Sequence, residues 1–385
     1  MRYQCFLFCI KYLRGVIISI LKINLNELRL NIKRYRTQLN KNQKFCAVVK
    51  ANAYGLGVRV ISREINELVD YFAVSSAEEF WEIKNIVSKP VLILDPIYEN
   101  ITKLAQDNCE FCVSNFKQLQ LIINLADVNN KLKFKLHLAF NTGMNRFGFN
   151  SENEIVECFK LLEKTQNVTI SGVFSHFYAG DNEYFAEIQS IKFLKLRNFL
   201  SKKIEINTIV FHIANTSGFE NQINFDMIRI GIGLFLFNNN SVFELESNIV
   251  EIQSLKKGDC AGYGRAFIAT QNTKVAVVAI GYADGVLRKI AGRGSVLVNG
   301  CFCKVLAVCM DSIIIDISNT NAELGDKVTL IGENSGSKIF VCDFASWCDT
   351  IDYEIMTRIS NRVKRVYIGG GVHADHNRKI SCKKT

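Results

Sequence analysis

One lysine of this chain directly follows a short apolar run. In the stretch AVVKANAYGLG (47–57), Lys50 comes after small and β-branched residues and before a turn rich in glycine and asparagine. An ammonium group at the end of a buried strand is costly to desolvate, and a desolvated lysine loses its proton more readily and can attack an aldehyde. Further polar residues follow comparable apolar runs later in the chain: Arg146, His176, Asn215, Thr216 and Arg229, with Gly231 and Gly233 after the last.

Together these residue types indicate one kind of chemistry. Hydroxyl groups and backbone amides next to glycines bind phosphate, and here Thr216 and the segment 231–233 supply them. A nucleophilic lysine beside a phosphate site suggests a Schiff base with pyridoxal phosphate. Each residue alone also has an ordinary structural explanation, such as a histidine bonded in the core, an arginine paired with a carboxylate or a threonine capping a helix.

The elements that must position these residues alternate along the first part of the chain. From about residue 44 to 237, eight short β-rich runs are separated by stretches with apolar residues three and four positions apart, such as 77–87, 116–126 and 184–200. This alternation predicts a (β/α)8 barrel, in which the C-terminal ends of the strands share one face. All the polar residues named above fall at such ends. A doubly wound open sheet is the alternative, although no glycine fingerprint follows the first run.

The second part of the chain has a different pattern. Beyond about residue 245, short β-rich runs are broken by Gly, Asn and Asp, with one short helical piece at 342–350, which predicts a mostly antiparallel β domain. We therefore expect an N-terminal extension at 1–20, a cofactor-binding barrel at 21–245 and a C-terminal β domain at 246–385. The strand that opens the barrel segment could instead pair with the C-terminal domain.

Composition and charge argue against several classes of protein. The net charge of +10 is spread along the 385 residues, and no basic run is interleaved with aromatics, so we do not predict nucleic-acid binding. Lys11 and Arg14 interrupt the apolar start of the chain, which predicts neither a membrane span nor a cleaved signal. The thirteen cysteines then suggest free thiols in a reducing cytoplasm. We predict no metal site, because CEFC (109–112) and HADH (373–376) lack partners at ligand spacing.

Short motifs spread over most of the chain carry a family resemblance. They are AVVKANAYGLG, TGMNRFGF, HIANTSG, IRIGIG, GYGRAF, GYADG and VCMDS, between about residues 23 and 367. In type and order they resemble the motifs of the alanine racemases, which are fold-type III pyridoxal-phosphate enzymes. The resemblance implies a barrel followed by a β domain, alanine as the substrate and a head-to-tail homodimer with shared active sites. It also implies a cytoplasmic enzyme that supplies D-alanine for peptidoglycan.

The resemblance assigns roles to individual positions. Lys50 resembles the lysine that binds the cofactor and acts as one base, and Tyr263 resembles the second base, which comes from the partner subunit. Arg229 matches the arginine that faces the pyridine nitrogen, and His176 matches the histidine beside it. The other matches are Tyr54, Asn215, Thr216, Gly231 and Ile232 for the cofactor, Arg146, Met310 and Asp311 for the substrate, and Asp181, Tyr282, Asp284 and Arg288 for the corridor that admits substrate.

The chemistry of racemisation requires these residue types. An α-proton leaves from one face of the substrate and another returns to the opposite face, so two bases must flank it. Tyrosine ordinarily has a pKa near 10 and is a poor base at neutral pH, so a chain through His176 to cationic Arg229 should stabilise its phenolate. Arginine also keeps its proton and does not readily protonate the pyridine nitrogen, which weakens the electron sink and limits transamination.

Two positions depart from the family pattern. Ala139 stands where a carbamylated lysine often supports the arginine of the TGM motif, so Arg146 needs another partner, such as a bound anion or Asn141. Asn361 stands where a gating tyrosine is common, which leaves the choice of substrate open. The alternatives are therefore a serine or broad-specificity racemase of the same fold and, from another class, a non-catalytic pyridoxal-phosphate-binding protein. The β domain that carries Tyr263 argues against the last.

Overall fold

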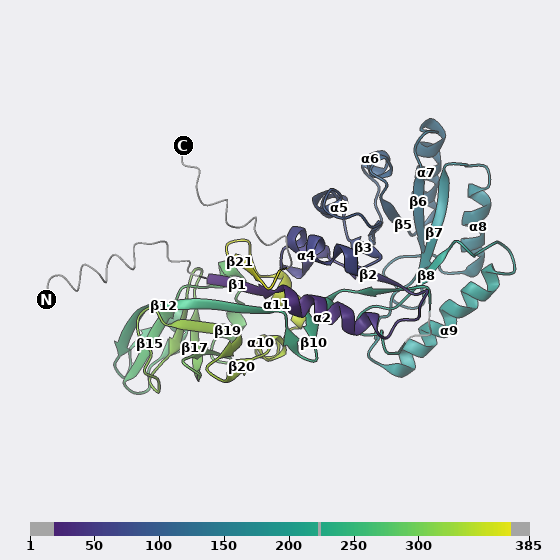
Figure 1. Ribbon diagram of the computed structural model, residues 1–385. Coiled ribbons are helices and arrows are strands. Elements are labelled where there is room, and N and C mark those ends of the chain that lie inside the picture. The colour runs from purple at the N-terminus through teal and green to yellow at the C-terminus, as the bar shows by residue number, and fades with distance from the viewer. Residues whose placement is uncertain (1–18, 222–224, 371–385) are drawn as a thin grey trace, which may run out of the picture. The chain divides into compact units, whose positions relative to one another are not determined.

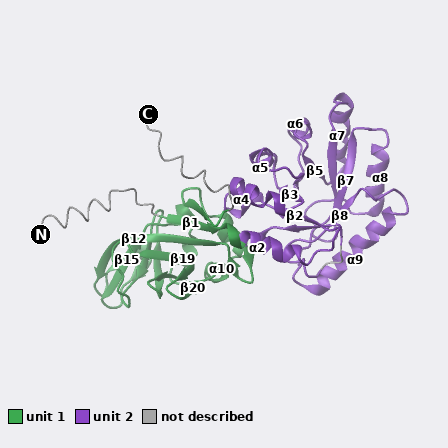
Figure 2. Cartoon of the chain, viewed as in Figure 1, with its two compact units in different colours: residues 1–27, 236–385 green, residues 28–235 purple. Residues whose placement is uncertain are grey.

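The chain divides into two compact units (Figure 2). The structure is a computed structural model that describes residues 19–221 and 225–370. The barrel unit is Leu28–Phe235, and the β unit combines Met1–Glu27 with Leu236–Thr385.

The barrel unit is built on an eight-stranded parallel sheet with the order β8-β7-β6-β5-β4-β3-β2-β9. Between its two end strands, the backbone N–H of Asp226 donates to the carbonyl oxygen of Phe211 at 2.9 Å, and that of Arg229 donates to Ala214 at 3.1 Å. The sheet is therefore nearly closed. Its strands are β2 (Lys44–Val48), β3 (Tyr71–Val74), β4 (Val91–Ile93), β5 (Glu110–Val113), β6 (Phe134–Ala139), β7 (Val168–Phe174), β8 (Val210–His212) and β9 (Met227–Ile230).

Helices follow the strands and lie around them (Figure 1). Several begin at a side-chain cap that accepts a hydrogen bond from the backbone N–H three residues later, which satisfies a donor that the helix leaves free; these caps are Ser76, Asn115, Ser151 and Asn182. The helical elements are α2 (Leu25–Arg36), which crosses the boundary between the units, α3 (Lys50–Tyr54), α4 (Val58–Ile65), η1 (Asn66–Leu68), α5 (Ala77–Ile83), α6 (Ile101–Gln106), α7 (Phe116–Val128), α8 (Glu152–Leu162), α9 (Glu183–Leu200) and η2 (Ile232–Leu234).

The barrel strands are buried along most of their length. Every residue of β3, β4, β5, β8 and β9 is buried, as expected for parallel strands that are covered by helices on one face and packed into the barrel on the other. Most of these side chains are apolar, which explains the near-continuous apolar runs of the sequence. The buried polar exceptions on the strands are Glu110, His137, His212 and Arg229.

The β unit contains a nine-stranded sheet with the order β20-β19-β16-β17-β18-β15-β12-β1-β21 and an additional pairing of β19 with β12. All its pairs are antiparallel except β1 with β21. The strands are β1 (Ser19–Asn24), β12 (Phe243–Leu255), β15 (Thr273–Val278), β16 (Ser295–Val298), β17 (Cys301–Val308), β18 (Ile313–Asp316), β19 (Lys327–Asn334), β20 (Ser337–Ile339) and β21 (Lys364–Ile368).

Shorter elements connect the strands of the β unit. Two ribbons pair β10 (Leu236–Phe237) with β11 (Asn240–Ser241) and β13 (Cys260–Ala261) with β14 (Phe267–Ile268). The helical turns are η3 (Tyr263–Arg265), η4 (Tyr282–Asp284), η5 (Arg288–Ile290), α10 (Val341–Cys348) and α11 (Asp352–Thr357).

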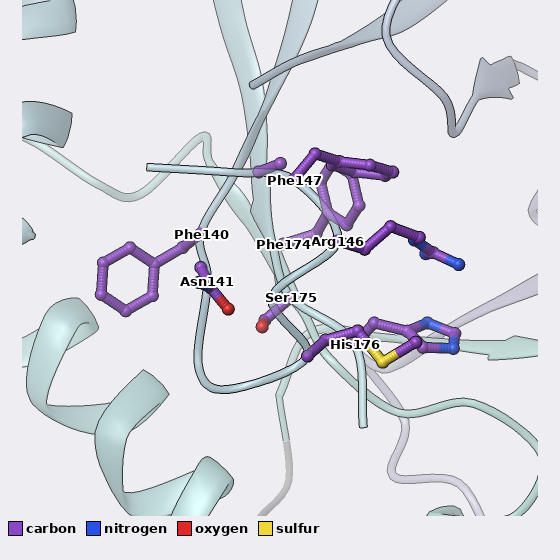
Figure 3. Close-up of a pocket in the computed structure, with 9 residues that line it drawn as sticks. Phe140, Asn141, Arg146, Phe147, Phe174, Ser175 and His176 are labelled. Atoms are coloured by element: carbon purple, nitrogen blue, oxygen red, sulfur yellow. The ribbon is translucent and has the colours of Figure 1, made fainter. Parts of the chain in front are cut away.

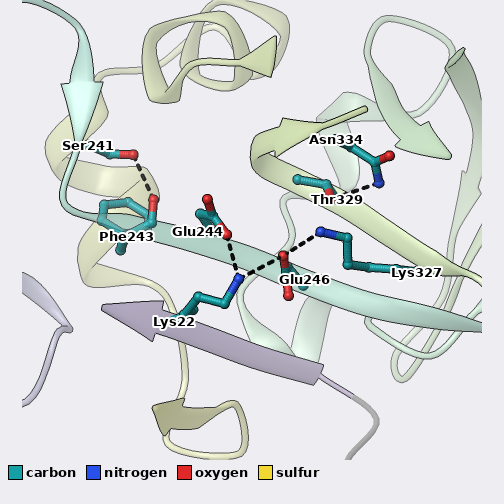
Figure 4. Close-up of polar contacts among 8 residues, drawn as sticks. All are labelled: Lys22, Ser241, Phe243, Glu244, Glu246, Lys327, Thr329 and Asn334. Atoms are coloured by element: carbon teal, nitrogen blue, oxygen red, sulfur yellow. Dashed lines mark hydrogen bonds and ion pairs between the residues drawn. The ribbon is translucent and has the colours of Figure 1, made fainter. Parts of the chain in front are cut away.

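The strand β1 belongs to the β unit although it precedes the barrel in sequence. It pairs with β12 and β21, and Lys22 on β1 bonds the carboxylates of Glu244 at 2.8 Å and Glu246 at 3.4 Å on β12 (Figure 4). Glu246 also accepts a hydrogen bond from Lys327 of β19 at 2.9 Å. The two compact units divide at 27/28 and 235/236, and the bounds 21–245 for the cofactor-binding barrel stay a prediction.

The prediction of a (β/α)8 barrel followed by a mostly antiparallel β domain is confirmed. Residues 1–18 of the expected N-terminal extension and the HADH stretch lie outside the described residues. The cysteines of the described part are free, and Cys109 and Cys112 of the CEFC stretch are both buried. Every helix in the described ranges is too short or too polar to traverse a lipid bilayer.

We expect Glu246→Gln to lower the free energy of unfolding by about 1–3 kcal/mol at pH 7, because Glu246 is 5% exposed, Lys327 loses its carboxylate and Lys22 loses one of two. Burial acts to raise the pKa of Glu246, but the hydrogen bond from Lys327 and the charge of Lys22 outweigh it and lower that pKa. The stabilisation should thus be complete above about pH 5 and vanish as the pH falls through the folded-state pKa.

Urea unfolding of both proteins between pH 3 and 7 measures this difference. Glu251→Gln is the control, because Glu251 is an exposed carboxylate on the same strand. A Glu246→Gln variant as stable as the native chain at pH 7 would contradict the assignment of β1 as a strand held by this network.

Candidate active site

Lys50 lies at the start of an unusual turn directly after β2. The residues 51–54 all have φ between 52° and 55°, so α3 is a turn of left-handed helix built from residues other than glycine. This conformation costs roughly 1–2 kcal/mol per residue. Two hydrogen bonds hold the turn in place. The carboxylate of Glu79 accepts from the Ala51 N–H at 2.7 Å, and the Asn52 side chain accepts from the Val58 N–H at 2.8 Å. Such strain, maintained by neighbours, is typical of functional sites.

A cradle for an anion lies after the last two strands of the barrel. The hydroxyl of Thr216, after β8, accepts hydrogen bonds from the backbone N–H groups of Gly231 at 3.1 Å and Gly233 at 3.3 Å, after β9. A Cβ atom at Gly231 would lie only 2.0 Å from the hydroxyl oxygen of Tyr54. Tyr54, Thr216 and the segment 231–233, including the buried Ile232, are therefore assembled into one group of hydroxyls and amides, which suits a phosphate.

Arg229 on β9 is a buried cation with neutral partners. Its side chain is 2% exposed and donates to His212 Nδ1 at 2.6 Å, to the Ser175 carbonyl oxygen at 2.6 Å and to the Ile213 carbonyl oxygen at 3.2 Å. Within residues 19–221 and 225–370, no carboxylate lies within ion-pair distance of it. Burial lowers the pKa of Arg229 to about 10, so the guanidinium remains charged at neutral pH.

His176, after β7, is a neutral imidazole beside this cation. Its Nδ1 lies 3.3 Å from Arg229 Nη2. Burial, followed by the charges of Arg229, Arg146 and Lys50, lowers the pKa of His176 to about 3. Because arginine only donates, we assign the single ring proton to Nε2. The amide nitrogen of Asn215 lies 3.3 Å from that Nε2, where both groups are donors and form no hydrogen bond with each other, and it donates to the Phe177 carbonyl oxygen at 3.2 Å.

His176 shares a pocket with Arg146. Figure 3 shows the two side chains projecting to the same side of the strand ends. Ala139 lies on the wall of this pocket, so a methyl group stands where the family often carries a modified lysine. The lining residues are Ala139, Phe140, Asn141, Met144, Arg146, Phe147, Phe174, Ser175 and His176.

The loop that carries Arg146 is shaped by Asn141. The Asn141 side chain accepts from the backbone N–H groups of Gly143 and Asn145, each at 3.0 Å, and the backbone carbonyl oxygen of Asn141 accepts from Lys192 at 2.9 Å. The Arg146 side chain is exposed, and its guanidinium carbon lies 4.9 Å from the centre of the Phe147 ring. Asn141 therefore orders the backbone around Arg146, because the Asn141 side chain makes its hydrogen bonds within the loop.

The remaining candidates, apart from Asp181, belong to the β unit. Tyr263, on η3, is 79% exposed, and Met310, between β17 and β18, is 51% exposed. Asp181, in the barrel unit, and Arg288, on η5, are both exposed. These candidates therefore divide between the two units. Asp181 belongs to the barrel unit, and Tyr263, Met310 and Arg288 belong to the β unit.

Within the β unit, one arginine links several of the candidates. Arg362 contacts the carboxylates of Asp311 at 2.7 Å and Asp284 at 3.4 Å. The backbone of Tyr282 donates to the Cys309 carbonyl oxygen at 3.0 Å, which ties η4 to the turn after β17. Sequence reasoning missed Arg362. The sequence signal that could have found it is a basic residue directly after Asn361, a position that departs from the family pattern.

Sequence reasoning also missed three buried polar residues inside the barrel. Glu110, His137 and His212 interrupt the apolar strands β5, β6 and β8, and each is at most 4% exposed. Their signal in the sequence was a titratable residue in the middle of a run that otherwise reads as core.

The fold and this site define a class of protein. A parallel barrel with a lysine after its first strand, an anion cradle after its last two strands and a separate antiparallel β unit is the architecture of barrel-type pyridoxal-phosphate enzymes. The residues present fit that cofactor, because the cradle offers hydroxyls and amides to a phosphate and a Cβ at Gly231 would collide with the Tyr54 hydroxyl that belongs to it.

The chain belongs to the alanine racemase family, whose members depend on pyridoxal phosphate and racemise an amino acid. Residues 23–239 match the family described as alanine racemase, N-terminal domain, and residues 242–367 match alanine racemase, C-terminal domain. The alanine racemase of Ligilactobacillus salivarius is 33% identical over 90% of this chain and 96% of that protein. The alanine racemase of Lactobacillus gasseri is 30% identical over 91% of this chain and 97% of that protein.

Solved structures agree with this assignment. The alanine racemase of Bacillus anthracis with bound L-Ala-P superposes with a TM-score of 0.86 at 27% identity, over 92% of this chain and 96% of that one. The fold is also that of the alanine racemase of Bartonella henselae with covalently bound pyridoxal phosphate, with a TM-score of 0.81 at 24% identity, over 91% of this chain and 99% of that one.

We expect Gly231→Ala to raise the dissociation constant for pyridoxal phosphate by about tenfold or more, because the added methyl displaces the Tyr54 hydroxyl from the cradle. Titration of the apo protein, followed by absorbance, measures this constant. Tyr54→Phe and the double variant complete the cycle: if the methyl acts through the hydroxyl, Gly231→Ala should cost much less affinity in the Tyr54→Phe background. An unchanged dissociation constant in Gly231→Ala would contradict the assignment of this cradle as the phosphate site.

Proposed function

We propose that this chain interconverts L-alanine and D-alanine with pyridoxal phosphate attached at Lys50. The observation that carries the proposal is the buried, permanently charged Arg229 beside the neutral His176, next to a half-buried lysine on a strained turn. A guanidinium in this position favours proton removal and return over the alternative reactions of the cofactor.

The cofactor would be held at both ends. Lys50 would bind its aldehyde, and the cradle of Tyr54, Thr216 and the amides of 231–233 would bind its phosphate. Arg229 would face the pyridine nitrogen, with His176 and Asn215 beside it. When bound, the cofactor supplies an electron-withdrawing ring that acidifies the α-hydrogen of an attached amino acid.

Two protein bases would act on opposite faces of the substrate. The Lys50 amine would take or return the proton on one face. Tyr263 of the partner subunit would serve the other face, which is supported by its position on an exposed turn of this chain. His176, which we assign as an Nε2–H donor, would stabilise the phenolate through a hydrogen bond, and Arg229 would hold the other ring nitrogen. The working enzyme would thus be a homodimer with shared active sites.

The substrate carboxylate would be bound by Arg146 and by the turn at Met310 and Asp311. A guanidinium offers paired donors to a carboxylate, and Arg146 can present them because its side chain is exposed, with its guanidinium over the Phe147 ring. Access would run past a corridor lined by Asp181, Tyr282, Asp284 and Arg288. The ion pairs from Arg362 to Asp284 and Asp311 support a shared position for these two carboxylates within the β unit.

Arg229 would also determine which reaction occurs. A group that keeps its own proton leaves the pyridine nitrogen unprotonated, so negative charge is less delocalised into the ring. Proton return to the α-carbon then dominates over transamination. In a walled bacterium the product D-alanine would feed peptidoglycan synthesis, and we place the enzyme in the cytoplasm in this proposal.

We expect borohydride reduction of the holoenzyme, followed by peptide mapping, to find a pyridoxyl group on the peptide that contains Lys50. Lys44, which begins the same strand, is the internal control and should stay unmodified. A modified lysine elsewhere, or protein that remains colourless and unmodified with added cofactor, would end the proposal.

We expect Tyr263→Phe to keep the cofactor but to slow racemisation by about 10²- to 10⁴-fold, because the hydroxyl is one of two proton-transfer groups. Exchange of the α-hydrogen with D₂O should persist for one enantiomer of alanine and stop for the other. Tyr184→Phe, at a 66% exposed tyrosine on α9, is the control. Unchanged exchange of both enantiomers would show that Tyr263 is not a base.

A further inference from the structure

A row of buried polar side chains crosses the interior of the barrel and ends at Arg229. Glu110 Oε2 lies 2.9 Å from His137 Nε2, and His137 Nδ1 lies 2.9 Å from His212 Nε2. His212 Nδ1 then lies 2.6 Å from Arg229 Nη1. All four side chains are at most 4% exposed, and they come from the strands β5, β6, β8 and β9. We call these residues the interior relay.

The donors and acceptors of the interior relay can be arranged in only one way. Arginine can only donate, so His212 Nδ1 must accept and His212 must carry its proton on Nε2. That N–H donates to His137 Nδ1, so His137 must carry its proton on Nε2 as well. The carboxylate of Glu110 accepts this last hydrogen bond. Every bond of the relay therefore runs in one direction, from the arginine to the glutamate.

This direction excludes a simple ion pair between Glu110 and a doubly protonated His137. A proton on His137 Nδ1 would require His212 Nε2 to accept. His212 would then accept at both ring nitrogens, because Arg229 already donates to Nδ1. A neutral imidazole has only one acceptor nitrogen, so that state breaks one bond of the relay.

The relay has little freedom to relax by movement. A Cβ atom at Gly172 would lie 2.3 Å from His137 Nδ1, so the β7 backbone packs directly against that ring. The Phe174 ring stacks on His212 with centroids 5.3 Å apart at 10°. Because these contacts hold the rings in place, we expect a change in the relay to move a proton and to leave the rings where they are.

The charge states support the same arrangement. Burial acts to raise the pKa of Glu110, but the hydrogen bond from His137 is the largest of the effects that outweigh it and lower that pKa, so this carboxylate can accept. Burial and the charge of Arg229 hold the pKa of His212 well below its usual range. Burial, followed by the charge of Glu110, raises the pKa of Tyr71, which stays a neutral hydroxyl.

We propose that Glu110 is a positioning residue that fixes the tautomers of His137 and His212 and thereby holds the guanidinium of Arg229 in place. Without a carboxylate at this position, His137 can carry its proton on Nδ1 instead. His212 would then present an N–H to the N–H of Arg229, and two donors would face each other in a buried site. The effect on turnover rests on the function proposed above, whereas the tautomers do not.

The direct test is the imidazole ¹⁵N NMR spectrum of the full-length holoenzyme, labelled at histidine. The chain has five histidines, so single substitutions can assign the signals. The proposal predicts neutral Nε2–H rings for His137 and His212 in the native protein. An Nδ1–H or doubly protonated ring at either position would overturn it without any variant at Glu110.

Glu110→Gln then tests the role in positioning. Its amide can donate as well as accept, so an Nδ1–H population should appear at His137 and His212, and kcat/KM for alanine should fall by about tenfold to a hundredfold. Glu110→Asp, which retains a carboxylate, should restore the native tautomers. Glu246→Gln is the matched control, because it makes the same change at a buried carboxylate of the β unit and should alter neither readout.

The outcomes separate the two proposals. A native enzyme that does not racemise alanine refutes the proposed function, but the tautomers can still be read. Unchanged tautomers in Glu110→Gln, or altered tautomers with an unchanged kcat/KM, would refute the positioning role of Glu110.

Discussion

The structure depends on one buried charge. Arg229 is fully enclosed in the barrel, and its hydrogen-bond partners are two imidazoles and two backbone carbonyl oxygens. Removing a cation from water without a neighbouring anion is expensive, so every acceptor around it must be correctly oriented. The site gains a fixed charge that no carboxylate of residues 19–221 and 225–370 neutralises. Burial, together with this charge, lowers the pKa of His176 and keeps that imidazole neutral.

The topology of the barrel creates this arrangement. β9 pairs with β2 and runs beside β8, so Arg229 reaches the loops that follow β7 and β8 while the next residues turn towards Tyr54. The left-handed turn after β2 brings Tyr54 to Gly231 and sets Lys50 at the mouth of the barrel. The close contact between Tyr54 and Gly231 and the strained backbone of residues 51–54 thus lie on one face of the barrel, the face where parallel barrels have their active sites.

Much of the fold could be predicted from the sequence. The eight apolar runs of the first part correspond to the eight strands, because parallel strands covered on both faces are apolar throughout. The position of β1 could not be fixed, since a short alternating strand pairs equally well by pattern with either unit. Its partner depends on contacts with β12 and β21 that lie more than 200 residues away.

The candidate site was predictable in its residue types but not in its geometry. Local preferences give no reason for Ala51 or Ala53 to adopt a left-handed conformation, which tertiary contacts impose. Arg362 and the interior relay were missed because their partners come from distant strands, so spacing along the chain carries no trace of them. Such side chains become visible only once β5, β6, β8 and β9 are placed in order.

The central claim is that Arg229 is charged and is surrounded by singly protonated histidines. Neutron diffraction from a crystal of the deuterium-exchanged protein near pH 7 would locate these protons directly. The account predicts deuterium at all five guanidinium N–H positions of Arg229 and at one ring nitrogen of each of His212 and His176. A neutral guanidine, or a doubly protonated ring at either histidine, would contradict it.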